Sequence, residues 1–188
     1  MTATATTSTT QPHVTTWTID AAHTSVEFAV RHMMISTVKG RFADVQGTLT
    51  FDEADPARSA VDVTIGTASI DTRSEQRDGH LRSADFFDVE QFPAIRFTST
   101  RVVKTGSDRY DLLGNLTIKD VTREVTLAVE DQGRGTTPWG QHQAGFTAST
   151  KIDRKDFGLT WNQALEAGGV LVADEVKIAI EVEFTKAG

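Results

Sequence analysis

Five histidines are the side chains of this sequence best suited to hold a metal or move a proton: His13, His23, His32, His80 and His142. His23 and His32 are an odd number of residues apart, which places them on opposite faces of a regular strand. The sequence contains no HExxH motif. It also contains no cysteine, which excludes disulfides, thiolate catalysis and cysteine-ligated metals. We therefore expect no metal and no other cofactor apart from a bound lipid.

His32 stands apart because its parity matches Val26, Phe28 and Val30, so it points inward if that strand is regular. A buried imidazole needs a hydrogen-bond partner. A neighbouring strand, a water molecule or the polar head of a ligand would provide one, and coordination of a haem iron is a further alternative.

Sequence motifs of nucleophilic catalysis and phosphate binding are missing. There is no GxSxG elbow and no GxxxxGK[ST] loop. Carboxylates are abundant, but acid–base pairs form in space, so abundance alone locates none. We expect a protein that is not an enzyme, and a lipid-modifying enzyme using carboxylates or His32 is the alternative.

Composition indicates one soluble domain. The chain has 188 residues, of which 38% are hydrophobic and 24% charged, and its net charge is −7. The basic residues are scattered, which argues against nucleic-acid binding, because that requires clustered Lys and Arg. No apolar run reaches the roughly 18 residues of a membrane span. A transient membrane contact and a homodimer stay open.

The first 16 residues, MTATATTSTTQPHVTT, are rich in threonine and have no periodic pattern. We expect a disordered tail over 1–16 and a single domain over 17–186. The tail has neither the charged nor the apolar region of a secretory signal, so we expect a cytoplasmic location.

The elements that must position these residues are strands. Alternation of apolar and polar residues is clearest over 176–184 and around Val121, and it recurs at 26–30 and 61–65. Further strands are expected at 37–51, 94–103, 109–118 and 143–152, with loops at 52–56, 104–108 and 131–135. About eight short-linked strands favour an all-β antiparallel barrel or sandwich.

One strand changes phase. Val38 and Phe42 share one parity whereas Val45 and Leu49 share the other, which predicts a bulge or sharp bend near Ala43 or Asp44. Such bends let long strands curl into a barrel. The inward glycines Gly40, Gly47 and Gly114 favour a hollow interior.

One short helix is expected near 73–83, begun by a capping box of Thr72 and Glu75. A helical turn over 83–88 follows and carries Phe86 and Phe87, and Pro93 ends it. This helical segment over 73–88 would form a lid over one barrel mouth, or its two rings would plug the barrel end.

Four segments in this order resemble the YceI-like family of lipid-binding barrels. They are Trp17–Phe28 followed by His32 and Val38–Phe42, Arg77–Asp88 with Phe92 and Pro93, Leu116–Thr122, and Ile152–Gly158. The resemblance runs from Trp17 to about Phe184. It implies an extended, lipocalin-like antiparallel barrel with an elongated apolar cavity, no catalytic activity, and a polyisoprenoid or isoprenoid quinone bound for transport, storage or metabolism.

The family's ligand contacts are not a strict motif, so the resemblance is carried over only at matching positions with inward parity or an aromatic ring. The expected ligand-binding residues are Phe28, His32, Phe42, Leu81, Phe86, Phe87, Phe157 and Trp161. Arg77 and Arg154 are the expected contacts of a polar headgroup.

Overall fold

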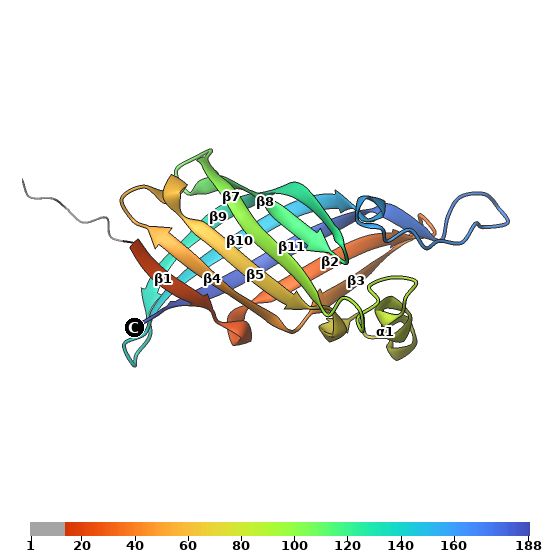
Figure 1. Ribbon diagram of the computed structural model, residues 1–188, viewed down its shortest axis with the longest axis horizontal. Helices are drawn as coiled ribbons and strands as arrows, with labels where there is room; N and C mark the ends of the chain where they lie inside the picture. Colours follow the sequence, from red (N-terminus) through yellow and green to blue (C-terminus); the bar gives the residue numbers. More distant parts are fainter. Residues whose placement is uncertain (1–13) are drawn as a thin grey trace, which may run out of the picture.

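The computed structural model describes residues 14–188, and its strands wind into one elongated, closed sheet (Figure 1). The strands are β1 (Val14–Ile19), β2 (Ser25–His32), β3 (Ser36–Phe42), β4 (Val45–Asp52), β5 (Ala60–Gly66), β6 (Ile70–Asp71), β7 (Ala94–Lys104), β8 (Arg109–Ile118), β9 (Val121–Thr136), β10 (His142–Asp153) and β11 (Val172–Lys186). The helix α1 spans Glu75–Arg82, and 3₁₀ turns cover Ala21–His23 (η1), Pro56–Arg58 (η2), Thr67–Ser69 (η3) and Arg154–Phe157 (η4).

The sheet closes through β11, which is paired on both edges. One edge pairs with β10, and the other pairs first with β2 and then, nearer the C-terminus, with β1. β1 and β2 therefore act as one interrupted strand, as do β3 with β4 and β5 with β6. The result is the closed antiparallel barrel of eight strands that the sequence predicted.

The predicted change of phase is confirmed. β3 ends at Phe42 and β4 begins at Val45, so Ala43 and Asp44 form the break between them. Phe42 and Val45 are both buried, although they differ in parity. The extra residue lets both halves of the long strand keep their apolar side chains inside.

Two strand boundaries differ from the prediction. β1 begins at Val14, so residues 14–16 belong to the sheet and not to a tail, while residues 1–13, with His13, lie outside the described residues.

The segment 131–135 is not a loop, because β9 continues through it to Thr136. The register places Gln132 as an extra residue, and Gly133 has a φ of 103°. Glycine at this position permits a bulge within the strand.

The predicted helix is present, but its cap is different. Ser74 is the N-cap, and its side chain accepts from the amide of Arg77. Thr72 is instead the last buried residue before the helix, where its hydroxyl and amide both donate to Asp78. The capping box therefore fails because Thr72 is fixed to a carboxylate inside the helix.

Buried side chains gather in three groups along the barrel. One group lies beneath α1 and includes Ile70, Phe86 and Phe157. A second, of Trp17, Leu49, Ala144 and Phe184, lies at the end where the C-terminus emerges. The third lies between β7, β8 and β9. We call the end of the barrel beneath α1 the helix end, and the end where the C-terminus emerges the terminal end. Among the described residues, no helix is long and apolar enough to cross a membrane.

Inward glycines make room for aromatic rings. A Cβ on Gly40 would overlap the ring of Phe28, which lies opposite it on β2, and a Cβ on Gly114 would overlap the ring of Phe97. The space left by these two glycines is therefore filled by protein. The interior is hollow for another reason, and these two glycines do not create the space as the sequence suggested.

We predict that Gly40→Ala lowers the free energy of unfolding by about 1–3 kcal/mol, because the Phe28 ring must leave its position. Urea denaturation measures the change. Gly79→Ala is the matched control, since a Cβ there meets nothing within 4 Å. In the helix it should raise stability by about 0.5–1 kcal/mol. Equal effects of the two substitutions would contradict this account of Gly40.

Candidate ligand-binding cavity

The barrel encloses a cavity of about 620 Å³. Its wall is built from alternate side chains of the strands, such as Val125, Leu127 and Val129 of β9 and Val176, Ile178, Ile180 and Val182 of β11. The predicted hollow interior is confirmed. The volume lies within the range of about 300–1,000 Å³ that is typical of sites for small organic ligands.

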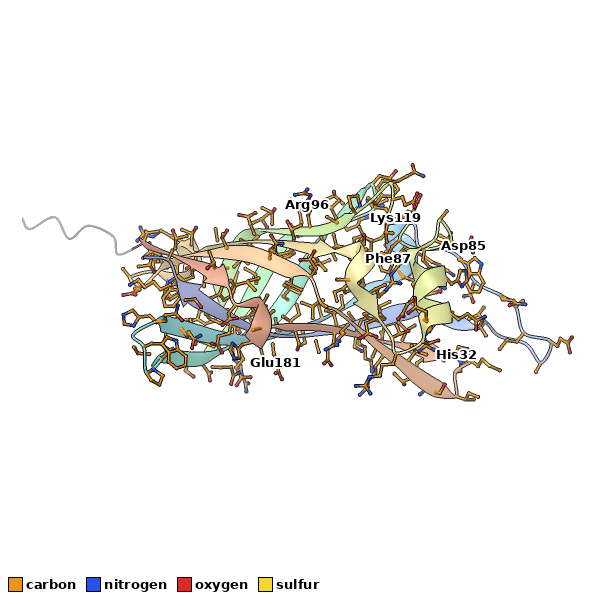
Figure 2. All side chains as sticks on the ribbon, turned by 90° about the horizontal axis from the view of Figure 1, so that it is seen from below. His32, Asp85, Phe87, Arg96, Lys119 and Glu181 are labelled. Atoms are coloured by element: carbon orange, nitrogen blue, oxygen red, sulfur yellow. The ribbon has the colours of Figure 1, made fainter. Side chains whose placement is uncertain are left out.

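Polar groups join this apolar wall at the helix end. His32 and Ser36 flank the turn of the β2–β3 hairpin, Thr72 comes from the segment before α1, and Arg77 and His80 come from α1 itself. Figure 2 places His32, Asp85 and Phe87 toward this end. A ligand whose apolar chain fills the barrel would meet these groups with its polar head.

Most of the residues predicted to bind a ligand contact the cavity: Phe28, His32, Phe42, Leu81, Phe86, Phe87 and Trp161. Their rings contact one another in two chains. Phe42 lies between Phe28 and Phe87, with ring centroids 5.7 and 5.8 Å apart. Phe86 and Trp161 are 5.4 Å apart. The geometry brings these residues to one end of the cavity, and their role in binding stays a prediction.

Phe157 does not belong to the cavity wall. Its side chain is 2% exposed and packs in the group beneath α1. The residue ends the turn η4, where Gly158 takes a left-handed conformation with a φ of 76°. Inward parity could not be assigned to Phe157 because the chain leaves the strand pattern at Arg154.

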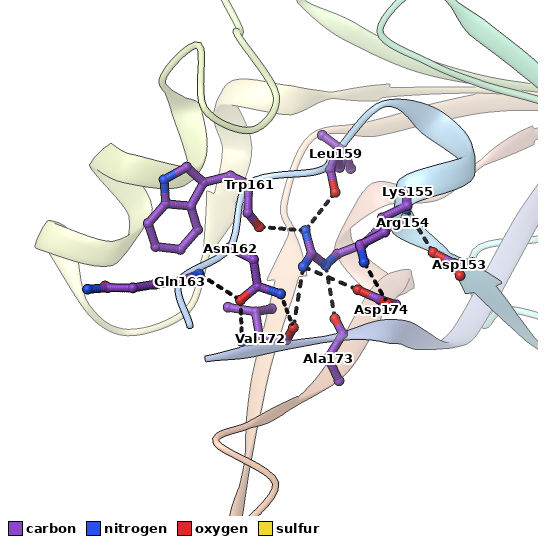
Figure 3. Close-up of polar contacts among 10 residues, drawn as sticks. All are labelled: Asp153, Arg154, Lys155, Leu159, Trp161, Asn162, Gln163, Val172, Ala173 and Asp174. Atoms are coloured by element: carbon purple, nitrogen blue, oxygen red, sulfur yellow. Dashed lines mark hydrogen bonds and ion pairs between the residues drawn. The ribbon is translucent and has the colours of Figure 1, made fainter. Parts of the chain in front are cut away.

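Arg154 lines the cavity but is fully engaged by the protein (Figure 3). Its side chain is 4% exposed. Nη1 donates to the carbonyls of Leu159 (2.6 Å) and Trp161 (2.8 Å), Nε donates to Ala173 (2.9 Å), and Nη2 donates to Val172 (3.3 Å). Its three nitrogens all donate to protein carbonyls, so the structure gives Arg154 a structural role, and the predicted headgroup role stays a prediction.

Arg154 instead fixes the loop 158–171 to β11. Its Nη2 also lies 3.5 Å from a carboxylate oxygen of Asp174. Burial lowers the pKa of the guanidinium, and the carboxylates of Asp174 and Asp153 oppose that effect. Asn162 adds a second clamp, because its side chain donates to the Val172 carbonyl and accepts from the Val172 amide. Buried carbonyls of an irregular loop are satisfied in this way.

Arg77 remains available as a headgroup contact. Its Nε donates to the Thr72 hydroxyl (2.7 Å) and its Nη2 to the Thr72 carbonyl (2.8 Å). Within the described residues, Nη1 has no hydrogen-bond partner. The two bonds to Thr72 orient the guanidinium at the cavity wall while leaving donors free.

His80 is a wall residue that the sequence analysis did not select. Its Nε2 lies 2.8 Å from Asp85, and its ring meets the rings of Trp161 (4.7 Å) and Phe86 (5.1 Å) edge on. Arg77, His80 and Leu81 are spaced i, i+3 and i+4, so they share one face of α1. This spacing is the signal that would have identified His80 together with its two neighbours.

The histidine pair His23 and His32 is separated, as their spacing predicted. His32 lines the cavity, whereas His23 lies in the exposed turn η1. His23 approaches Asp20 (2.9 Å), and Glu183 completes a group whose ligand-type atoms lie within 4.8 Å of one another. His23 is exposed and the two carboxylates are half-buried, and His23 precedes β2 whereas His32 ends it, so the strand separates this group from the cavity's polar end.

Comparison with known proteins identifies the barrel. Residues 17–184 match the model of the YceI-like domain. Protein YceI of Salmonella newport (strain SL254) is 44% identical over 164 residues, which cover 87% of this chain and 82% of that protein. The chain belongs to the YceI-like family. The resemblance drawn from the sequence motifs is thereby confirmed.

Solved structures show the same YceI-like fold. BcnA of Burkholderia cenocepacia superposes with a TM-score of 0.77 at 25% identity, covering 88% of this chain and 98% of that chain. A Campylobacter jejuni YCEI protein gives 0.72 at 32% identity, covering 84% and 90%. A domain from Saccharophagus degradans described as polyisoprenoid binding gives 0.70, covering 91% and 98%, but at 14% identity it shows the fold alone.

We predict that Arg154→Met lowers the free energy of unfolding of this YceI-like protein by about 3–5 kcal/mol, because it removes the donor to the carbonyls of Leu159, Trp161 and Ala173. Urea denaturation gives the value. Lys155→Met is the control, since Lys155 also pairs with Asp174 (2.9 Å) but is exposed. It should change stability by less than about 1 kcal/mol. An Arg154 variant as stable as the control would contradict the structural role of Arg154.

We predict that Asp20→Asn lowers the pKa of His23. The hydrogen bond to Asp20 raises the pKa of His23 above its usual value, and the same bond lowers the pKa of Asp20. The pair therefore stabilises the fold between these two pKa values. Its contribution is lost as pH rises through the pKa of His23 or falls through that of Asp20. NMR titration of the His23 ring measures the shift, and an unchanged pKa would show that the pair does not form.

Proposed function

We propose that this YceI-like protein binds a long apolar lipid inside its barrel, a polyisoprenoid or an isoprenoid quinone, for transport, storage or metabolism. The observation that carries the proposal is the cavity of about 620 Å³ with its wall of inward apolar side chains. The proposed function needs no catalytic residue, metal or further cofactor.

The shape of the cavity suits a chain-like ligand. Its wall extends from Phe51 and Phe146, in the group at the terminal end, to Trp161 and Leu171 at the helix end. Burial of each methylene-sized group is worth about 0.8 kcal/mol, or roughly 4 kcal/mol for a five-carbon prenyl unit. A few units therefore exceed the cost of association, which is about 4–15 kcal/mol.

A polar head would lie beside Arg77 and His32. Both line the cavity at the helix end, and Arg77 presents free donors there. A guanidinium favours an anionic or strongly hydrogen-bonding head. Selection among headgroups would rest on these two side chains, since the rest of the wall offers mainly apolar contact.

The fold family supports the choice of ligand class. The Saccharophagus degradans domain of the same fold is described as polyisoprenoid binding. At 14% identity the likeness speaks to the fold, so the support for this chain rests on its own cavity and on that shared architecture.

Organic extraction of the purified protein, followed by mass spectrometry, tests the proposal directly. A prenyl lipid should leave with the protein, or added geranylgeraniol should bind to it. Failure of both would overturn the proposal. Absorbance after addition of haem separates the alternative in which His32 holds an iron, since only that alternative predicts a Soret band.

We predict that Ala148→Phe weakens geranylgeraniol binding about tenfold or more while leaving the fold intact. Ala148 lies on the cavity wall in β10, so a phenyl ring there occupies ligand space. Quenching of tryptophan fluorescence measures affinity, because Trp161 also lies on the wall. Ala128→Phe on the exposed face of β9 is the control and should bind as the original protein does. Unchanged binding by Ala148→Phe would place the ligand outside the barrel.

A further inference from the structure

The tip of the β2–β3 hairpin exposes apolar residues that the fold does not require. Met33, Met34 and Ile35 are 39%, 60% and 76% exposed. The tip is a tight turn, closed by a hydrogen bond from the Ile35 amide to the His32 carbonyl. Both central residues are left-handed, with φ of 51° for Met33 and 60° for Met34.

Such a turn favours asparagine and glycine, which adopt positive φ with little strain. Methionine is a poor choice for it on conformational grounds, and exposure makes it a poor choice on solvation grounds. Val170, in the adjacent loop 158–171, is a further exposed apolar residue, and the Met33 amide is bonded to the Leu171 carbonyl. The sequence therefore keeps an apolar patch where stability alone would select polar residues.

Basic residues lie directly behind this tip. Arg31 donates to the Met34 carbonyl and is exposed. On the outer face, the register aligns Lys39 of β3, Ala29 of β2, Lys177 of β11 and Lys151 of β10 in one row. Lys177 and Lys151 are direct cross-strand neighbours, an arrangement that destabilises a sheet by itself.

Of the acidic residues nearest this row, Glu27 of β2 and Asp153 of β10 have no basic partner within 4 Å among the described residues, whereas two others are paired. Glu175 lies 3.5 Å from Lys151, and Asp174 is held by Arg154 and Lys155. On a protein of net charge −7, Lys39 and Lys177 thus stand on this face without an acidic partner within 4 Å among the described residues. That face complements an anionic surface.

The tip is also continuous with the cavity. His32 and Ser36, which flank the turn, both line the cavity wall, as does Leu171. In Figures 1 and 2 the hairpin and the loop 158–171 project together beyond the barrel at the helix end. A surface that received the tip would therefore lie at the mouth through which the polar groups of the wall are reached.

We propose that the β2–β3 hairpin tip docks this protein onto an anionic lipid bilayer, where lipid passes between membrane and cavity. Met33, Met34 and Ile35 enter the interfacial region, and Arg31, Lys39 and Lys177 contact anionic headgroups. The inference rests on the proposed lipid-binding function and adds the partner from which the lipid is taken.

The terminal end offers a matched control. Trp139 is 77% exposed in the turn between β9 and β10, so it resembles the tip in exposure. It has no comparable lysine row, and the same end carries the exposed acidic residues Glu53 and Asp55. Trp139→Asn should leave membrane binding unchanged.

Flotation of the full chain with vesicles tests the docking. The protein should float with vesicles of phosphatidylcholine and phosphatidylglycerol, more weakly as salt rises, and not with phosphatidylcholine alone. The double variant Met34→Asn/Ile35→Thr should lose at least about tenfold in binding without loss of stability, because asparagine suits the turn. Lys39→Gln/Lys177→Gln should lose about tenfold on the anionic vesicles.

Absence of vesicle binding by the original protein, or equal binding by the tip variant, would overturn the proposal. So would loss of binding in Trp139→Asn alone. A dimer seen by analytical ultracentrifugation and abolished by the tip variant, without vesicle binding, would assign the tip to a second copy and would likewise overturn it.

A second measurement separates this inference from the proposed function. Geranylgeraniol supplied in detergent should fill the tip variant and the original protein to the same extent. The same alcohol supplied in anionic vesicles should enter the tip variant about tenfold more slowly. No binding from either source would refute lipid binding itself, whereas equal rates from vesicles would refute only the docking.

Discussion

β11 is hydrogen bonded along both of its edges, and this double pairing fixes the width of the barrel. One edge is in register with β10 from Gln143 to Asp153, and the other is shared by β2 and β1. A sheet closed in this way has no second sheet against which its inner face could collapse. With eight strands in cross-section, the inward rows either fill the interior or leave room for one slim molecule. The cavity thus follows from closure of the sheet, and no single wall residue creates it.

β6 does not pair with β7, and the segment 67–93, which fills this gap, contributes three polar residues to the cavity wall: Thr72, Arg77 and His80. β5 pairs with β7 only as far as Gly66 and Ala94. Beyond that point Thr67 bonds to the backbone of Phe92 and Pro93, and Arg82 of α1 bonds to the carbonyls of Ala68 and Ile70. Groups that would form a ladder are satisfied by side chains instead. The opening of the sheet therefore gives these three polar groups access to the interior.

The sequence predicted what repeats along a strand and failed where the chain leaves a strand. Alternation located the strands, and the change of parity between Phe42 and Val45 located the bend, because both depend only on burial of one face. Phe157 and Arg154 lie in a turn, where parity says nothing about direction. The glycines of 131–135 predict a loop, but glycine serves a bulge equally well.

Residue type alone could not decide which arginine would face a ligand. Arg77 and Arg154 are both cavity-lining arginines in family-like segments. The difference is the number of unpaired carbonyls near each: the irregular loop 158–171 brings several to Arg154, whereas Arg77 meets only Thr72. That number depends on the path of an irregular loop, which has no periodic pattern. No local pattern encodes it.

The two ends of the barrel differ in how they could admit a guest. At the terminal end, the guanidinium of Arg134 of β9 lies over the rings of Phe51 of β4 (4.7 Å) and Phe146 of β10 (5.4 Å), so opening that end would take a charged group from its ring contacts. At the helix end, α1 is held to the β6 segment by polar bonds but meets Trp161 through the edge of the His80 ring. An apolar chain can replace ring contacts of that kind without leaving a polar group unpaired. The helix end is thus the less costly entrance, and it is the end at which the β2–β3 hairpin projects.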